Sequence, residues 1–238
     1  VGARRHHAIK VPPRRHCADE PNVCWSWDVT YLPTSIRGLS FYLYLIMDIY
    51  SRKIVGHEVF EAENMNNSAT LIQRAVLREK CAHKPLVLHA DNGSAMKGST
   101  LYAKLDSLGI TPSHSRPRVS NDNAYSESLF RTCKYHPRFP TNGFNQIEDA
   151  RQWVHHFVRW YNEEHRHSQI RYVTPAQRHA GQDEDILRAR HELYQQAQRA
   201  NPARWSGQTC NWQPIGEVWL NPDKNLEIIQ QEKTLEAA

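Results

Sequence analysis

Three acidic residues in three different local settings most constrain how this chain can fold. Asp28 lies inside a strand-like run (VCWSWDVTYL), Asp91 directly follows a short apolar run (PLVLHADNGS), and Glu127 lies near the start of an amphipathic segment (NDNAYSESLFRTCKY). A strand, a strand end and a helix can bring distant carboxylates together at one edge of a sheet. Such a cluster repels itself unless a cation neutralises it, and Mg²⁺ is a hard cation that takes oxygen ligands. The alternative is three unrelated solvated acids among 25.

Hydrophobic patterns around these acids predict a mixed sheet. Residues 24–32 alternate between two faces, with Asp28 on the more polar one. Residues 41–49 are almost continuously apolar, as expected of a central strand covered on both sides. Residues 53–60 follow a short turn and suggest a hairpin. A short strand over residues 86–89 then delivers Asp91 to a turn.

Helical patterns fill the intervals after these strands. A helix capped by Asn66 or Asn67 is expected after the third strand. Residues 100–108 predict a second helix. The pair Asn145 and Glu148 resembles a capping box that opens a long helix with apolar positions on its inner face. A further helix is expected over 185–199, and residues 111–122 are expected to form a loop rich in Pro, Ser and Arg.

Five sequence segments occur together in one order over about residues 24–180. They are WSWDVTYLPT, LYLIMDIYSRKIVG, VLHADNGS, ITPSHSRPRVSNDNAYSESLFRTCK and YNEEHRHSQIRYVTPAQ, and 35 residues separate Asp91 from Glu127. With these segments the chain resembles the retroviral-integrase-like transposases of bacterial insertion sequences, which carry an Asp-Asp-Glu catalytic core. One departure is His165, where many members have Arg.

The resemblance implies a fold, a site and a cofactor. The implied fold is α/β: an RNase H-like mixed five-stranded sheet with helices on both faces, plus a helical and extended C-terminal tail. Asp28, Asp91 and Glu127 would be both catalytic and metal-binding, with Mg²⁺ or Mn²⁺ as the cofactor and two ions expected with DNA bound. The chain would be a second-reading-frame (OrfB-type) product, or an N-terminally truncated piece of one.

Several cationic and amide side chains near the trio are candidates for binding DNA. Arg131 and Lys134 lie four and seven residues after Glu127, on the same side of a helix. The alternative for them is a plain intrahelical Glu–Arg pair. His114 and two arginines lie in the loop before Glu127, which could close on DNA or remain merely solvated. Two asparagines could position DNA or order the Asp91 and Glu127 segments, with ordinary turn and cap roles as the alternative. The predicted DNA-binding residues are Lys134, Arg131, Arg116, Arg118, Asn123 and Asn92.

Two residues close to these motifs favour structural roles. Asp48 ends the central strand, so pairing with Arg52 or capping the turn is favoured over metal binding. His89 precedes Asp91 by two residues, and because Mg²⁺ prefers oxygen, a core or supporting histidine is favoured over a ligand. The tail tryptophans Trp205, Trp212 and Trp219 predict packing anchors, with base stacking as the alternative.

Charge and composition bound the organisation of the chain. Residues 1–16 hold five cations and no carboxylate, which equals the net charge of +5. This pattern predicts a basic arm or linker over 1–22. The resemblance implies an integrase-like catalytic core over 23–180, and a C-terminal helix and extended tail are expected over 181–238. The arm is either a phosphate-binding segment or a linker. The longest apolar run is too short for a membrane span, and five scattered cysteines suggest free thiols in a reducing cytosol.

These observations predict a DNA transposase catalytic subunit that cleaves transposon ends and transfers the 3′-OH strand to DNA. The alternatives are an RNase H-like nuclease and a non-catalytic DNA-binding remnant of a transposase. The expected partner is double-stranded DNA, at transposon ends and target, and no membrane is expected. A homo-oligomer and an upstream-frame helix-turn-helix protein are further expected partners. The expected location is the cytoplasm, in association with the nucleoid when DNA is bound.

Overall fold

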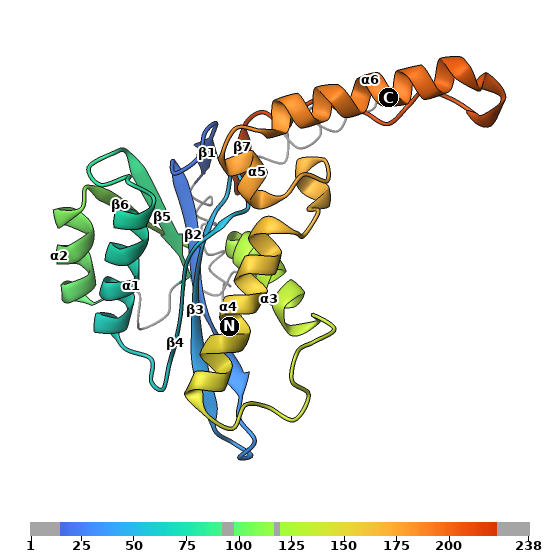
Figure 1. The fold of residues 1–238 in the computed structure, drawn as a ribbon. Coiled ribbons are helices and arrows are strands. Elements are labelled where there is room, and N and C mark those ends of the chain that lie inside the picture. The colour runs from blue at the N-terminus through green and yellow to red at the C-terminus, as the bar shows by residue number, and fades with distance from the viewer. Residues whose placement is uncertain (1–14, 92–97, 117–119, 223–238) are drawn as a thin grey trace, which may run out of the picture.

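A five-stranded mixed sheet forms the centre of the molecule (Figure 1). The structure is a computed structural model that describes residues 15–91, 98–116 and 120–222. The strand order is β4-β3-β2-β5-β6. The first three sheet strands form an antiparallel meander, and the last two run parallel to β2. Their bounds are β2 Cys24–Pro33, β3 Ser40–Asp48, β4 Ile54–Phe60, β5 Leu86–Ala90 and β6 Ile110–His114.

Helices cover both faces of this sheet, and its inner strand β3, which lies second from one edge, is apolar on both sides. Tyr44 and Ile46 pack with helices α1 (Met65–Arg78) and α2 (Ser99–Ser107) in one core cluster. The alternate residues of β3 pack on the opposite face with helix α3 (Ala124–Lys134) and the long helix α4 (Ile147–Glu163). This two-sided burial is what the continuous apolar run in the sequence predicts.

The remaining elements are short, except for one helix that extends from the core (Figure 1). In the described residues, no helix combines the length and apolar character needed to cross a bilayer. A separate two-stranded ribbon pairs β1 antiparallel with β7 and so joins the start and the end of the described chain. The bounds are β1 His16–Ala18, η2 Ser120–Asn123, η3 Ser168–Ile170, α5 Pro175–His179, α6 Asp183–Ala200, η4 Pro202–Arg204 and β7 Val218–Leu220.

Two helix caps lie at other residues than the sequence pattern predicted. Helix α1 is capped by Asn64, whose side chain accepts a hydrogen bond from the backbone N–H of Asn67. Helix α4 is capped by Gln146 with Asp149 in a capping box, one residue later than the predicted pair. Each helix begins within a run of polar residues, so several side chains of similar chemistry could serve as the cap. The backbone conformation selects one of them.

The predicted loop over residues 111–122 is wrong at its start, where the structure contains strand β6. Pro112 and its polar neighbours are poor strand formers, so the local pattern indicated a loop. Strand β6 lies at the edge of the sheet, where a proline without an N–H is tolerated. Ser113 is buried there and bonds to His89 on the neighbouring strand β5. Long-range pairing therefore overrides the local preference.

Asp48 caps the turn after β3, which is one of the two structural roles predicted for it. Its side chain is fully buried, and its carboxylate accepts hydrogen bonds from the backbone N–H and hydroxyl of Ser51, both at 2.7 Å. The backbone N–H of Asn22 donates a third bond at 2.7 Å. The Arg52 guanidinium instead lies 4.2 Å from the ring centroid of Tyr125. The carboxylate of Asp48 is thus used within the fold.

The C-terminal part of the chain is fastened to the same turn. His179 bridges the Ser51 hydroxyl, at 2.9 Å, and the Glu79 carboxylate, at 3.0 Å. The buried Arg178 guanidinium lies over the ring of Tyr50, 4.1 Å from its centroid, and donates to the Tyr50 carbonyl. Residues of the YSRK segment therefore meet Arg178 and His179, which directly follow the TPAQ segment, in one mostly buried polar cluster.

Two tail tryptophans pack against helix α6, as predicted for packing anchors. Trp212 lies 5.3 Å from the ring of Tyr194 and 4.7 Å below the Arg190 guanidinium. Trp205 contacts Tyr194 from another side, with ring centroids 6.0 Å apart. The third tryptophan, Trp219, lies in β7 of the terminal ribbon.

Asn162 of the YNEEH segment completes the hydrogen bonding of the edge strand β4. Its side-chain oxygen accepts from the backbone N–H of Ile54 at 2.9 Å, and its amide nitrogen donates to the carbonyl of the same residue at 3.0 Å. An edge strand has unpaired backbone groups, and here a side chain of α4 pairs with two of them. This contact fixes α4 against the sheet.

We expect Asn162→Ala to lower the free energy of unfolding by about 1–3 kcal/mol, because two partly buried backbone groups lose their partner. Urea unfolding followed by circular dichroism measures the change. Glu163→Ala, at the next and exposed position, is the control and should change stability little. Equal effects of the two substitutions would contradict this role of Asn162.

Candidate active site

The register of two parallel strands places Asp28 beside Asp91. Strand β2 pairs with β5 through Trp27 and Ala90, and the two acids are the next residues on their strands. Neighbouring strands lie about 4.8 Å apart, so the two carboxylates start from adjacent backbone positions. Asp28 is half-buried within β2, and Asp91 is half-buried at the end of β5.

Helix α3 brings the third acid to the same strand, because its first turn is bonded to β2. The Ser26 hydroxyl donates to the Asn123 side-chain oxygen at 2.6 Å and lies 2.6 Å from the Ser126 hydroxyl. The Asn123 amide nitrogen also donates to the Trp27 carbonyl at 3.3 Å. All three side chains of this clamp (Ser26, Asn123 and Ser126) are buried. Glu127 follows directly and is exposed.

Electrostatics join the three acids into one cluster. The pKa of Asp28 is raised to about 7, mainly by burial and then by the negative charges of Asp91, Glu127 and Glu63, against a hydrogen bond from the Val29 N–H that lowers it. A carboxyl group with such a pKa is one whose ionised form lacks a positive partner. The sequence analysis did not identify Glu63, which lies between β4 and α1.

The donor set suits a hard divalent cation. All three predicted ligands are carboxylates, and a cation would neutralise the repulsion that raises the pKa of Asp28. Within residues 15–91, 98–116 and 120–222, no three acidic, histidine or cysteine side chains already stand close enough together to hold a metal ion. Asp28 and Asp91 are adjacent through the strand register, and Glu127, whose charge also raises the pKa of Asp28, has an exposed side chain.

Two histidines order the backbone around Asp91. His89 is fully buried, and its Nε2 donates to the Asp122 carbonyl at 3.0 Å, which leaves Nδ1 to accept from the Ser113 hydroxyl. Burial lowers the pKa of His89 to about 4, so the ring is neutral, as predicted for a core histidine. His114 ends β6, and its Nδ1 lies 3.2 Å from the Asp91 carbonyl.

Comparison with known proteins identifies the family. Two models described as "Integrase core domain" match residues 18–120 and 108–175. The chain belongs to the integrase core family. It is 30% identical to the transposase for insertion sequence element IS904 of Lactococcus lactis, over 66% of this chain and 61% of the relative. It is 28% identical to transposase InsF for insertion sequence IS3A of Escherichia coli, over 67% of this chain and 54% of the relative.

A solved structure supports the same assignment at the level of fold. The catalytic core domain of HTLV-2 integrase, solved in complex with magnesium, superposes with a TM-score of 0.50 at 18% identity. The match covers 67% of this chain and 97% of that domain. The RNase H-like mixed sheet implied by the sequence resemblance is thereby confirmed. The chain spans about 54–61% of the length of the insertion-sequence transposases named above.

The other predicted site residues of this integrase core differ in their surroundings. Arg116 binds the buried Asp122 carboxylate through its backbone N–H, Nε and Nη2, each at 2.9 Å, and so closes the segment before α3. Asn123 is buried in the hydrogen-bonded clamp to β2 and so orders the segment that carries Glu127. Arg118 and Asn92 lie outside the described residues.

Arg131 and Lys134 project from the exposed side of α3. The Arg131 guanidinium lies 5.9 Å from the ring centroid of Tyr135. Among the described residues, the salt bridges do not include one between Arg131 and Glu127, so the geometry does not favour the intrahelical pair. Both cations are accessible beyond Glu127 on the same helix.

The serines of the clamp had only a weak sequence signal. Ser26 precedes Asp28 by two residues and therefore shares its face of β2. A small hydroxyl side chain at that position indicates that something packs closely there, but it does not identify the partner. Asn123 and Ser126 lie about 100 residues away in sequence, so local patterns could not connect them with Ser26.

We expect Asp28 by itself to lower the stability of the metal-free protein as pH rises from about 4 to about 7. In this window the folded protein holds a proton on Asp28, whose pKa is about 7, while the unfolded chain has released it. This site therefore binds a proton on folding, and its contribution to the free energy of unfolding falls with rising pH, by up to about 1.4 kcal/mol per pH unit. Buried histidines such as His89, whose pKa is lowered to about 4, contribute in the opposite sense, so the Asp28 contribution is measured as the difference from a variant without this carboxyl group, by urea unfolding in EDTA at several pH values.

Asp28→Asn is the matched variant for this measurement, because an amide has nearly the same shape and no ionised form. Its stability relative to the unmodified protein should increase as pH rises from about 4 to about 7, so that the variant is the more stable of the two at pH 8. An unchanged slope in Asp28→Asn would contradict the assignment of the raised pKa to this residue.

Proposed function

We propose that this protein is the catalytic subunit of a DNA transposase that cleaves transposon ends and transfers the 3′-OH strand to DNA. The observation that carries the proposal is the placement of Asp28 and Asp91 on neighbouring parallel strands, with the pKa of Asp28 raised by burial and then by like charges. Membership of the integrase core family supports it. The curated relatives are transposases of insertion sequences, which supports a DNA substrate.

We propose that Asp28, Asp91 and Glu127 hold Mg²⁺ or Mn²⁺ when DNA is bound, with Asp28 shared between two ions. Such a pair of ions activates the attacking oxygen and stabilises the departing one in phosphoryl transfer. The magnesium in the related HTLV-2 integrase core supports this choice of metal. Because Asp28 binds a proton more strongly than an ordinary carboxyl group, metal binding would release that proton and would weaken as pH falls.

Glu127 would complete the site by a side-chain movement. Its carboxylate is exposed, whereas the helix turn that carries it is fixed to β2 through Ser26, Asn123 and Ser126. The backbone is therefore positioned in advance, and only side-chain rotamers must change when a cation is present. This arrangement makes Ser26 and Asn123 positioning residues in the proposal, because they act on the reaction through Glu127.

The DNA backbone would run along α3. Arg131 and Lys134 are exposed on the side of the helix that continues from Glu127, and phosphates favour such cations. Arg116 would act mainly through its hydrogen bonds to the Asp122 carboxylate, just before α3. The two remaining predicted DNA-binding residues, Asn92 and Arg118, lie outside the described residues. In sequence, Asn92 follows strand β5 and Arg118 follows strand β6.

Assembly partners form part of the same proposal. Joining two transposon ends requires two active sites, so we propose a homo-oligomer on double-stranded DNA. The curated relatives are longer than the part of them that this chain matches. We propose that DNA recognition needs a region like that additional part, or an upstream-frame helix-turn-helix protein. Action on genomic DNA would locate the protein at the nucleoid.

A strand-transfer assay with a labelled transposon end tests this function. With Mg²⁺, the unmodified protein should cleave the end and join it to target DNA. Asp28→Asn, Asp91→Asn and Glu127→Gln should each lower joining by more than about a hundredfold, since outer-shell partners alone contribute about 10–100-fold. DNA binding in Ca²⁺ should remain close to that of the unmodified protein.

Asp106→Asn is the matched control, because Asp106 is an exposed aspartate on α2. It should keep normal joining. Cleavage without joining by the unmodified protein would favour a nuclease, and DNA binding with neither activity would favour a non-catalytic remnant. Near-normal joining by any of the three carboxylate variants would contradict the role proposed for that residue.

A further inference from the structure

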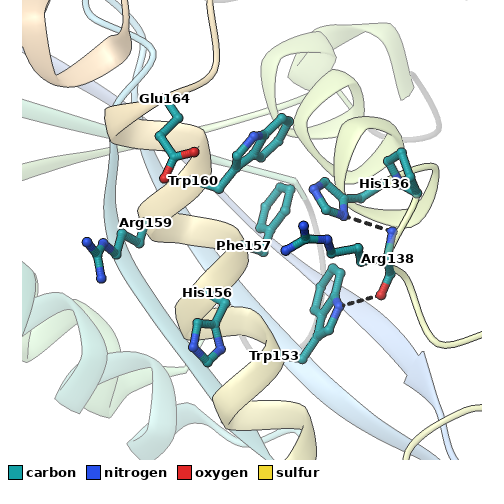
Figure 2. Close-up of a pocket in the computed structure, with 9 residues that line it drawn as sticks. His136, Arg138, Trp153, His156, Phe157, Arg159, Trp160 and Glu164 are labelled. Atoms are coloured by element: carbon teal, nitrogen blue, oxygen red, sulfur yellow. Dashed lines mark hydrogen bonds between the residues drawn. The ribbon is translucent and has the colours of Figure 1, made fainter.

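A large cavity lies between helix α4 and the segment that follows α3 (Figure 2). Its volume is about 810 Å³, within the range of about 300–1,000 Å³ typical of ligand pockets. None of the predicted site residues lines it. The lining residues are His136, Pro137, Arg138, Trp153, His156, Phe157, Arg159, Trp160 and Glu164.

Aromatic rings of α4 form one wall of this cavity. Trp153 and Phe157 lie nearly parallel, with an interplanar angle of 6° and centroids 5.5 Å apart. Trp160 lies one turn further on and meets the His136 ring edge-on at 4.6 Å. Figure 2 shows the three α4 rings directed toward the segment after α3. Trp153 and Trp160 are only half-buried, so part of each ring remains accessible from the cavity.

Positive charge surrounds these rings. Arg138 extends from the opposite wall toward α4 (Figure 2), and Arg159 lies on the outer side of the helix. The Arg138 backbone is fixed, because its carbonyl accepts from the Trp153 indole N–H at 2.8 Å and its N–H donates to His136 at 3.2 Å. The lining residues include two arginines and one acid, Glu164. Arg159 also lies 3.4 Å from the Glu163 carboxylate, so Arg138 is the cation that extends toward the rings.

The cavity begins two residues after the C-terminal end of α3. Lys134 ends that helix, and His136 of the cavity follows two residues later. From Glu127 to Lys134 the helix rises about 10 Å, at about 1.5 Å per residue. A DNA strand rises about 3.4 Å per nucleotide, so this length corresponds to about three nucleotides. A strand held at Glu127 could thus reach the cavity within a few nucleotides.

We propose that this cavity binds an unpaired nucleotide of DNA, with the base stacked on the α4 rings and the phosphate held by Arg138 or Arg159. Aromatic faces bordered by cations are the chemistry by which proteins hold unpaired bases. A second copy of this chain is the competing occupant, since aromatic residues and Arg are also enriched at protein interfaces. The inference rests on the proposed function in taking DNA as the substrate.

Binding of a short fluorescein-labelled oligothymidylate to the full chain tests the inference, measured by fluorescence anisotropy in EDTA. Trp160→Ala should weaken binding by about tenfold or more, as expected for the loss of one stacked base. Trp160→Phe should keep most of the affinity, because a ring remains. Arg138→Ala should also weaken binding, and this exposed position carries little risk of unfolding the protein.

Arg188→Ala is the matched control for charge, since Arg188 is an exposed arginine on α6 that pairs with Asp185 at 3.0 Å. It should bind oligothymidylate normally. Trp160→Ala should weaken the binding of a blunt duplex much less than the binding of the oligothymidylate. Equal losses for the two DNAs would overturn stacking of an unpaired base, as would normal binding by both cavity variants or no binding by the unmodified protein.

Sedimentation of the same variants tests the competing occupant. If Trp160→Ala and Arg138→Ala dissociated an oligomer while oligothymidylate bound normally, the cavity would be an interface between copies and the inference would be overturned. The strand-transfer assay separates this inference from the proposed function. Ends joined normally with no cavity effect on binding would overturn only the inference, whereas cavity-dependent binding without any joining would overturn only the function.

Discussion

The parallel pairing of β2 with β5 is the constraint on which the candidate site depends. It brings Asp28 and Asp91 to neighbouring positions although their charges repel. Like charges about 4 Å apart repel by roughly 4 kcal/mol at an effective dielectric near 20. The strands remain paired because the sheet is covered on both faces by apolar clusters, whose burial stabilises the fold far more than this repulsion opposes it. The raised pKa of Asp28 is the local consequence.

The third acid is held by a different kind of contact. Glu127 lies on a helix, and hydrogen bonds from Ser26 to Asn123 and Ser126 fix the start of that helix to β2. His89 adds a bond to the Asp122 carbonyl from the strand that carries Asp91. Hydrogen bonds therefore join the start of α3 to β2, and Asp122, which precedes the helix, to β5. Each of these bonds lies within a few residues of one of the three carboxylates. A cation would then have to reorganise side chains but not the backbone.

The sequence predicted those parts of the molecule that depend on local pattern or on family motifs. The meander, the strand before Asp91 and the helix of Glu127 have clear periodicity, and all three are present. Strand β6 was missed because Pro112 and its polar neighbours favour a loop, and only pairing with β5 makes them a strand. The β1–β7 ribbon and the Ser26 clamp were not foreseen, since both join residues about 100 or more positions apart.

A crystal structure of the protein with Mn²⁺ and a transposon-end DNA tests the central claim most directly, because anomalous scattering locates the metal independently of any assay. The account predicts a metal peak bonded to carboxylate oxygens of both Asp28 and Asp91, with Glu127 turned toward the site. A peak that contacts neither aspartate, or an Asp28 side chain that stays protonated and directed away from the DNA, would contradict it.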